Sequence, residues 1–439
     1  MSALHTRLLN ALAPWRAAPA WRIALSGGLD STILLHLLAT LARQQALPPL
    51  SALHVHHGLQ AAADAWPAHC QALCDGLGVP LRVLHVQVDD SASVERAARE
   101  ARYAALAGML GEGELLLTAQ HRDDQAETLL LRLLRGAGVR GLAGMPVSRP
   151  LGRGHMLRPL LECSRAELEA YAEAEGLRWV EDPSNADTRL ARNFLRRDTL
   201  PTLTRHWPQA AANLARAAAH LREAQGLLDE LAEQDLAAAQ TPAPFPWLRL
   251  PSLELAPLAR LSAARQRNAL RHWLAELTPL PDRDHWAGWV SLRDAAGDAQ
   301  PLWRLGRGEL HRAGGRLWWL AGDWLQAPVA PVAWPDPASP LDLPGNGVLQ
   351  LQGTPPEGPL EVRYRQGGEV LHLPGRGHRD LKRLLNEAGL PAFLRGRLPL
   401  LYRAGELLAV ANLPRLNSQG EEAFRVHWQG PTNDRSLSW

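Results

Sequence analysis

Residues 22–31 read Arg-Ile-Ala-Leu-Ser-Gly-Gly-Leu-Asp-Ser, and the first part of the chain is organised around them. The apolar run Ile23–Leu25 predicts a buried strand, and the apolar residues between Ile33 and Leu41 predict a helix. The two glycines form a tight turn between them, where the lack of a Cβ lets the backbone approach a ligand closely. Such a junction points backbone N–H groups and the positive end of a helix dipole at one spot. The stretch therefore predicts an anion site, to which the hydroxyls of Ser26 and Ser31 add donors.

The alternative is a plain strand–turn–helix junction with Asp30 or Ser31 as the helix N-cap. The stretch is not a Walker A loop, because no Gly-Lys-Ser/Thr is present. The complete string Ser26-Gly27-Gly28-Leu29-Asp30-Ser31 resembles the pyrophosphate loop of the N-type ATP pyrophosphatases. This resemblance implies that the six residues bind ATP, usually with Mg²⁺. It also implies that AMP is attached to an oxygen of the substrate and is then displaced by a nucleophile.

Strand and helix signals alternate through residues 21–150. This alternation predicts a parallel sheet with helices on both faces. Ligands of such sheets bind at the carboxyl ends of the strands, so Ser26–Ser31, His54–Gly58 and His121–Thr128 are expected to meet at one edge. The predicted strands are Ile23–Leu25, Ser51–Val55, Leu81–Val88 and Leu115–Thr118, and the predicted helices cover 31–44, 64–77 and 93–110.

The segment His121-Arg122-Asp123-Asp124-Gln125-Ala126-Glu127-Thr128 opens a predicted helix, with Asp123 or Asp124 as its N-cap. Asp124 and Glu127 are three residues apart, so their carboxylates share one face of that helix. The two acids repel each other unless a cation lies between them, and Mg²⁺ or a substrate ammonium would serve. The alternative is a capping box with solvated acids, in which Glu127 is the third helical residue. The position opposite the glycine turn favours a ligand-binding site.

The segment Val55-His56-His57-Gly58-Leu59 is rich in histidine. A polar loop at the end of a strand is the simpler interpretation. Metal binding is disfavoured, because the histidines have no partner at helical spacing. The location favours a contact between His57 and the bound nucleotide.

Arginines cluster between Arg189 and Arg197, around Asn193. Arg192 and Arg196 are four residues apart and share one face of a helix. The pattern alone leaves a solvated helix face and an anion clamp for phosphate both open.

Composition limits the partners and the compartment. The chain has 439 residues, of which 46% are hydrophobic, enough for two or three domains. The net charge is only +2, so a nucleic acid would need a local basic patch. Three cysteines are too few for a disulfide framework, and their odd number favours the reducing cytoplasm. The sequence has neither an apolar run of membrane-helix length nor a signal-peptide pattern, so no membrane partner is expected.

Composition and periodicity also predict the order of domains. The fold class is an α/β N-terminal domain with a parallel sheet, then a helical domain, then a small α+β C-terminal domain. Helical periodicity runs through 209–238 and 258–277, and a Pro-, Ala- and Asp-rich stretch precedes the C-terminal domain. The predicted bounds are 1–205, 206–325, a linker over 326–346, and 347–439.

Seven basic residues lie between positions 375 and 403, where the acidic residues are only Asp380 and Glu387. Such a patch in a nearly neutral chain is the electrostatic signature of a nucleic-acid partner. The alternative is a solvated basic helix. The seven are Arg376, Arg379, Lys382, Arg383, Arg395, Arg397 and Arg403.

A series of motifs in order resembles the tRNA(Ile)-lysidine synthetase family over nearly the whole chain, most weakly in 206–330. One departure is Phe393, where the family pattern leads us to expect tryptophan. The motifs are Ser26–Ser31, Val55–Leu59, His121–Thr128, Gly141–Met145, Arg158–Leu161, Glu181–Asn185, Arg192–Arg196, and Lys382–Tyr402 with Gly389–Pro391 and Arg395–Tyr402.

The resemblance implies a specific reaction. ATP adenylates the carbonyl oxygen at carbon 2 of the wobble cytidine in the CAU anticodon of isoleucine tRNA. The amine of free lysine then expels AMP and forms lysidine, so that the tRNA reads AUA rather than AUG. The implied partners are this tRNA and free lysine in the cytoplasm; oligomeric state is open, with a homodimer as one alternative.

The same resemblance implies roles for the candidate residues. Asp124 and Glu127 would hold the ammonium groups of lysine, and His121 or one of these acids would be the base. Arg192 would steady phosphate charge as AMP departs, and Arg196, also a candidate for that task, would contact the tRNA. Asp30 would also place Mg²⁺. The C-terminal domain would bind the tRNA, and the mainly helical domain would also contact it. The other residues assigned to tRNA binding all lie in the C-terminal domain: Arg379, Lys382, Arg383, Arg395 and Arg397.

Three rival functions remain open. A tRNA thiolase of the same loop family needs catalytic cysteines, but Cys70 and Cys74 resemble core residues of a helix. An ammonia-using synthetase would not need residues 347–439. An RNA-binding module with a vestigial nucleotide site conflicts with the intact glycine turn and acidic segment.

Overall fold

The computed structural model describes residues 3–58, 61–87, 94–281, 284–296 and 299–433. Among the residues predicted above, Leu59, Val88, Ser93 and the last six positions lie outside these ranges. The chain forms two compact units, residues 1–226 and 227–438. The predicted domain boundaries at 205, 325 and 346 remain predictions.

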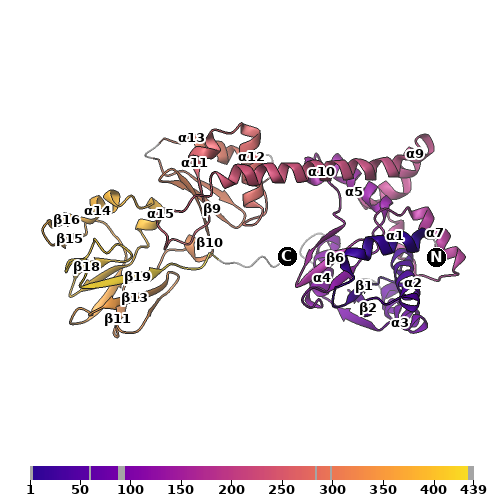
Figure 1. The fold of residues 1–439 in the computed structure, drawn as a ribbon, viewed down its shortest axis with the longest axis horizontal. Coiled ribbons are helices and arrows are strands. Elements are labelled where there is room, and N and C mark those ends of the chain that lie inside the picture. The colour runs from indigo at the N-terminus through magenta and orange to yellow at the C-terminus, as the bar shows by residue number, and fades with distance from the viewer. Residues whose placement is uncertain (1–2, 59–60, 88–93, 282–283, 297–298, 434–439) are drawn as a thin grey trace. The chain divides into compact units, whose positions relative to one another are not determined.

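A six-stranded sheet forms the centre of the first unit (Figure 1). The first four strands and β6 run parallel, and β5 is antiparallel to β6 at one edge. The predicted parallel sheet is confirmed, and a hairpin that the sequence pattern had not revealed extends it. The order is β3 (Leu81–His85), β2 (Leu50–His56), β1 (Trp21–Ala24), β4 (Leu115–Leu117), β6 (Gly154–Leu157) and β5 (Ser148–Leu151).

Helices cover both faces of this sheet, as the alternation predicts. Strand β4 shows it directly, because Leu115 and Leu117 join one apolar core and Leu116 joins another. Helix α2 (Leu29–Gln44) supplies the largest share of the first core, and α4 (Val94–Gly108) supplies Leu106 to the second. The remaining elements are α1 (Ala3–Leu12), η1 (Ala13–Trp15), η2 (Ala61–Ala65), α3 (Trp66–Leu77), α5 (Arg122–Leu134), α6 (Val139–Leu142), α7 (Arg165–Ala174), η3 (Pro183–Ala186), α8 (Ala191–Phe194), the π-helical η4 (Leu195–Thr199) and α9 (Leu200–His206).

The start of α5 differs from the prediction. The N-cap is His121, not Asp123 or Asp124, and Asp124 is the third helical residue. Its Oδ2 accepts a hydrogen bond of 3.1 Å from the backbone N–H of His121. The capping box therefore uses Asp124 in the position that was predicted for Glu127, and it leaves Glu127 one turn further into the helix.

The second unit contains two groups of strands. The first is a four-stranded sheet, β7 (Ser252–Glu254), β10 (Arg316–Ala321), β9 (Gly308–Ala313) and β8 (Leu302–Leu305), which packs with helices around a core containing Leu270, Trp289 and Leu317. Helix α10 (Ala210–Ala237) begins in the first unit and ends in this one. The helices of this part are α11 (Leu255–Ala259), α12 (Ala263–Leu274), η5 (Asp284–Trp286) and α13 (Ala287–Asp294).

The predicted helix over 258–277 is interrupted. Ser262 accepts a hydrogen bond from the backbone N–H of Arg265 and caps α12, so α11 ends before it. A serine whose side chain bonds the backbone in this way starts a helix more readily than it continues one.

The remaining strands form the small sheets near the C-terminus. The stretch 326–346, predicted as a linker, contains β11 and β12, and both pair with strands of these sheets. The sheets are β11 (Val332–Trp334), β14 (Leu360–Arg363), β17 (Leu400–Arg403) and β18 (Glu406–Val410); β12 (Leu341–Leu343), β13 (Gly347–Gly353) and β19 (Phe424–Gln429); and β15 (Val370–Leu373) with β16 (Gly377–Asp380). The helices here are η6 (Gly322–Leu325), α14 (Leu381–Glu387) and α15 (Ala392–Arg395).

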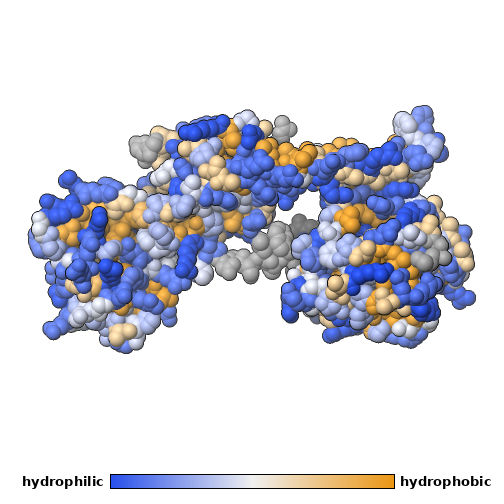
Figure 2. Space-filling view, in the orientation of Figure 1, coloured by the Kyte–Doolittle hydropathy of each residue, from blue (hydrophilic) through white to orange (hydrophobic). Residues whose placement is uncertain are grey.

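The visible surface of both units is mostly hydrophilic, with apolar residues in small patches (Figure 2). Within the described ranges, no helix has the length and apolar character needed to cross a bilayer.

Candidate active site

The glycine turn lies where the sequence predicts it, between β1 and α2. Gly28 is the N-cap of α2, so the first N–H groups of that helix have no helical partner and point out of its end. The Ser31 hydroxyl accepts from the Ser26 N–H at 3.2 Å and donates to the Gly28 carbonyl at 3.0 Å. These bonds hold the turn in a cradle of backbone donors.

Gly27 cannot be replaced without strain. Its φ is +86°, a left-handed conformation that favours glycine. A Cβ at this position would lie 3.1 Å from Val180 and 3.2 Å from the Cys70 sulfur. Both the backbone angle and the packing behind the turn therefore require glycine.

Two residues predicted to bind ATP have different surroundings. The Leu29 side chain is buried in the core beneath the turn, so only its backbone faces outward at the helix start. His57 follows the end of β2 and is partly exposed, and burial lowers the pKa of its imidazole, with nearby Arg102 and His56 acting in the same direction. A neutral imidazole is suited to a hydrogen bond with a nucleotide.

Asp30 joins the turn to the acidic segment. Its carboxylate accepts two hydrogen bonds from Nη1 of Arg165, at 2.8 and 2.9 Å. Its Oδ1 also lies 3.8 Å from Nε2 of His121, and the same nitrogen lies 3.5 Å from Oδ2 of Asp124. The glycine turn and the acid pair thus belong to one cluster, although about ninety residues separate them in the sequence.

The acid pair is neutralised by two arginines. Arg192 donates to Glu127 Oε2 at 2.8 Å and to Asp124 Oδ1 at 3.0 Å. Arg196 donates to Glu127 Oε1 at 2.6 Å and to Asp124 Oδ1 at 2.9 Å. The Glu127 side chain is only 1% exposed, so its charge needs these partners. The cation that the crowded acids required is present within the chain itself.

Burial and charge act against each other on these groups. Burial raises the pKa of Asp124. The positive charges of His121, Arg192 and Arg196 lower it by more than burial raises it, so the net pKa lies below the ordinary value. Burial lowers the pKa of His121, but Asp123, Asp124 and Asp30 more than offset this and raise it. Burial is the main cause of the raised pKa of Asp30. The cluster therefore holds Asp124 as an anion and favours a protonated His121.

Arg165 and Asp123 were not predicted as site residues. Asp123 accepts from the backbone N–H of Arg165 at 2.8 Å, and its Oδ2 lies 3.7 Å from Nδ1 of His121. Arg165 follows Ser164, the N-cap of α7, which forms a capping box with Glu167. That cap predicts where α7 starts but does not show that its first residue reaches Asp30, 135 positions away.

Gln125 anchors the acidic segment from behind. Its side chain donates to the Met145 carbonyl at 2.9 Å and accepts from the Met145 N–H at 2.7 Å. Arg222 of α10 donates to the same carbonyl at 2.9 Å. The glycine-rich stretch before Met145 is therefore fastened to α5, next to the acid pair.

Comparison with known proteins identifies the relatives of this chain. A PP-loop domain model matches residues 1–203, a TilS substrate binding domain model matches 253–318, and a TilS substrate C-terminal domain model matches 360–428. The tRNA(Ile)-lysidine synthase of Pseudomonas aeruginosa is 66% identical over 438 residues, with 99% of each chain covered. The synthases of Pseudomonas fluorescens (64%, covering 99% of this chain and 98% of the relative) and Methylococcus capsulatus (43%, 93% and 96%) are also similar.

The chain belongs to the tRNA(Ile)-lysidine synthase family. It is therefore a ligase with a PP-loop domain, a domain type that implies ATP binding. The fold class predicted from the sequence agrees with this family, from the N-terminal PP-loop domain to the small C-terminal domain.

The cysteines of this chain are not suited to the sulfur transfer that a tRNA thiolase would need. Cys70, Cys74 and Cys163 are all buried and free. Burial raises the pKa of Cys70 to about 12 and that of Cys74 to about 11, so neither forms a thiolate at neutral pH.

The basic residues predicted in the C-terminal part differ in exposure. Arg379, Lys382 and Arg383 are exposed on β16 and α14, while Arg395 is partly exposed and donates to the Leu390 carbonyl and the Asn386 side chain. Arg397 is only 3% exposed, and its Nη2 donates to the carbonyls of Gln326 and Asp323. Its guanidinium group lies in the interior of this unit, so its predicted contact with tRNA does not fit this structure.

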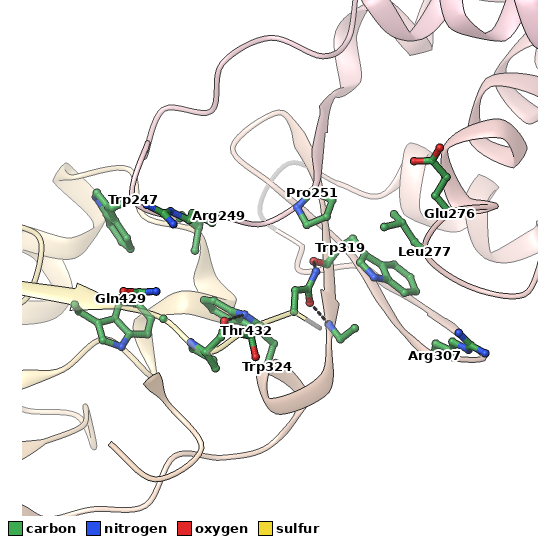
Figure 3. A pocket seen from close by; sticks show the side chains of 16 residues that line it. Trp247, Arg249, Pro251, Glu276, Leu277, Arg307, Trp319, Trp324, Gln429 and Thr432 are labelled. Atoms are coloured by element: carbon green, nitrogen blue, oxygen red, sulfur yellow. Dashed lines mark hydrogen bonds between the residues drawn. The ribbon is translucent and has the colours of Figure 1, made fainter. Parts of the chain in front are cut away.

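The second unit also has a cavity of about 510 Å³. Side chains of Trp247, Trp319 and Trp324 surround it, with Arg249 and Arg307 among the polar groups (Figure 3). None of the residues predicted for the active site lines it. The cavity is therefore distinct from the cluster around Asp30.

The glycine turn yields a stability prediction. We expect Gly27→Ala to lower the free energy of unfolding by about 2–3 kcal/mol, because it combines an unfavourable φ with overlap against Val180 and Cys70. Urea unfolding measures it. The matched control is Gly78→Ala, where φ is +69° but a Cβ meets nothing within 4 Å, and we expect about 1 kcal/mol. Equal losses in the two variants would show that packing behind the turn is unimportant.

Proposed function

We propose that this enzyme ligates free lysine to carbon 2 of the wobble cytidine in the CAU anticodon of isoleucine tRNA, through an adenylated-tRNA intermediate. The observation that carries the proposal is a single cluster that joins the PP-loop to the acid pair. In it, Nε2 of His121 lies within 4 Å of both Asp30 of the PP-loop and Asp124 of the acid pair. An anion cradle next to two buried carboxylates fits ATP and a diamine in one site. The relatives of the chain are tRNA(Ile)-lysidine synthases, which supports isoleucine tRNA as the substrate.

In the proposed first step the carbonyl oxygen at carbon 2 of cytidine attacks the α-phosphorus of ATP. The α–β phosphoanhydride bond breaks and pyrophosphate leaves. The backbone donors of residues 26–31 and the helix dipole of α2 would hold the pyrophosphate, and His57 would contact the nucleotide.

Mg²⁺ would accompany ATP and neutralise charge on its phosphates. Asp30 fits it, because burial disfavours the Asp30 anion and one carboxylate with phosphate oxygens is a common donor set for this ion. Arg165 donates to both Asp30 oxygens, and each oxygen keeps a lone pair that the ion could use.

Lysine would bind to Asp124 and Glu127, where arginines lie in the structure. Guanidinium groups bind phosphates in bidentate geometry, so ATP would draw Arg192 and Arg196 towards its phosphates. Asp124 and Glu127 would then be buried anions without partners, which is strongly unfavourable. The ammonium groups of lysine would relieve this, so the exchange of cations makes ATP binding favour lysine binding.

In the proposed second step the lysine amine attacks carbon 2, the bond from carbon 2 to the AMP-bearing oxygen breaks, and AMP leaves with that oxygen. The amine loses a proton to one of the acids or to His121 in its neutral form, a form that the neighbouring carboxylates disfavour. Arg192 would stabilise the negative charge on the departing AMP.

The tRNA would contact the second unit through exposed basic side chains. Arg379 and Lys382 have no carboxylate within 4.0 Å among the described residues, whereas Arg383 is paired with Glu387 at 3.1 Å. We propose Arg379, Lys382, Arg383 and Arg395 as phosphate contacts and leave Arg397 out, because it is buried. Arg196 would contact the tRNA only after it leaves the acid pair. ATP, lysine and tRNA are all cytoplasmic, where we place the reaction.

The activity itself is tested with labelled lysine. We expect the full-length enzyme with ATP, labelled lysine and unmodified tRNA carrying a CAU anticodon to transfer label into the RNA. The label should be absent without ATP, and it should be absent with a tRNA whose wobble base is not cytidine. Failure of transfer with the correct tRNA, despite ATP-dependent release of pyrophosphate, would refute lysine as the nucleophile.

The lysine site is tested by substitution. We expect Asp124→Ala and Glu127→Ala to raise the KM for lysine by roughly 10- to 100-fold, since each removes one charge-assisted contact. Glu173→Ala, which removes an exposed acid from α7, is the matched control and should leave this constant unchanged. An unchanged KM for lysine in both site variants, with normal folding, would exclude the acid pair as the lysine site.

The exchange of cations predicts linked binding. Calorimetry with α,β-methylene ATP, which cannot be cleaved between the α- and β-phosphates, should show lysine binding at least tenfold more tightly than without the analogue. Arg196→Gln should reduce this ratio, because one guanidinium no longer competes with lysine for Glu127. Equal lysine affinity with and without the analogue would rule the exchange out.

A further inference from the structure

A second group of arginines surrounds one tyrosine of the first unit. The guanidinium carbons of Arg99 and Arg149 lie 5.0 and 5.3 Å from the centre of the Tyr103 ring. Arg158 lies beside the same tyrosine, is only 4% exposed, and donates to the Pro146 carbonyl at 2.7 Å. We call these four residues the Tyr103 cluster.

The Tyr103 cluster has three positive charges, and the described part of the chain places no carboxylate close enough to pair with them. Among the side chains that the structure describes, no Asp or Glu oxygen lies within 4.0 Å of a guanidinium nitrogen of Arg99, Arg149 or Arg158. The Nε of Arg158 is buried and has no hydrogen-bond partner. Cation–π contact with one ring compensates only part of the repulsion between guanidinium groups.

The pKa values show the same imbalance. Burial lowers the pKa of Arg158, Tyr103 offsets part of this, and Arg149 and Arg99 lower it further. Burial lowers the pKa of Arg132 on α5, and Arg99 adds to the effect. Arginine nevertheless stays charged in proteins, so the imbalance persists until an anion binds.

Strand topology brings the Tyr103 cluster to the carboxyl ends of the parallel strands, where the PP-loop also lies. Arg158 follows the carboxyl end of β6, and Arg149 lies at the start of β5, where Ser148 pairs with Leu157. Arg99 lies in the first half of α4, the helix that follows β3. Because β1 and β5 are three positions apart in the strand order, the cluster lies roughly 15 Å from the end of β1, where the PP-loop begins.

We propose that the Tyr103 cluster binds a phosphodiester of the RNA strand that carries the target nucleotide. Guanidinium groups recognise phosphate oxygens in pairs, and a partly exposed tyrosine framed by arginines offers a face for an unstacked base. The phosphates of ATP are held at the PP-loop, so the anion here belongs to the RNA. This assignment rests on the proposed function only for the identity of the RNA.

The test measures how tRNA binding depends on salt. Arg99→Gln and Arg149→Gln each remove one charge from a side chain that is at least partly exposed, so the fold should survive. For each we expect the slope of log K against log salt to fall by about 1 relative to the native enzyme, and tRNA affinity at 100 mM salt to fall about tenfold. The probe is unmodified tRNA with a CAU anticodon, without lysine.

Arg153→Gln is the matched control. It removes the same charge from the same hairpin, but Arg153 lies in the turn between β5 and β6, at the opposite edge of the sheet, and its side chain is 73% exposed. We expect its salt slope to match that of the native enzyme. Binding of α,β-methylene ATP should be unchanged in all three variants.

Two outcomes would overturn the proposal. The first is a native salt slope in both Arg99→Gln and Arg149→Gln. The second is weaker binding of the ATP analogue with native tRNA binding, which would assign the Tyr103 cluster to the nucleotide. The salt dependence measures tRNA binding and needs no lysine transfer. Failure of lysine transfer would therefore refute the proposed reaction without contradicting a reduced salt slope in the two variants.

Discussion

The balance of charge at Asp124 and Glu127 constrains the first unit more than any other interaction. Two carboxylates on one helical face, one of them 1% exposed, cannot remain ionised without cations. Arg192 and Arg196 supply them from 65 to 72 residues away, so the segment from α8 to η4 must lie against α5. The short π-helical turn that carries Arg196 interrupts the regular helix here, as often happens at functional sites. The two acids are thus paired within the chain itself.

One edge of the sheet gathers charges of both signs. The PP-loop presents backbone donors after β1. The cluster of Asp30, His121 and the acid pair lies after β4, and the Tyr103 cluster lies at the carboxyl end of β6. In the proposals made above, these zones bind a triphosphate, a diamine and a phosphodiester in that order. Parallel strands make this possible, because every connection that follows a strand emerges at the same edge. Arg165 and Gln125 keep the zones in register by fastening Asp30 and α5 to neighbouring segments.

Much of this arrangement was predictable from local pattern. The alternation of strands and helices and the glycine turn depend on neighbouring residues, and the structure confirms them. Predictions were wrong where two local solutions compete. By its sequence, Asp124 could be either the N-cap of α5 or its third residue. The extended backbone of His121 makes His121 the N-cap and Asp124 the third residue. Arg397 was counted with its exposed neighbours because charge alone does not reveal which guanidinium turns inward.

The sequence by itself determined the class of fold, the place of the anion cradle and the identity of the acids, because strand periodicity, glycine turns and helical spacing act over a few residues. Only the tertiary structure decided which cations those acids meet. It also brought Arg165 to Asp30 across 135 positions and gathered Arg99, Arg149 and Arg158 around one tyrosine, with no carboxylate paired to them among the described side chains. Side-chain pairing over such separations depends on the packing of whole helices against the sheet. No local pattern records that packing, so the partners of a buried charge become visible only in the folded chain.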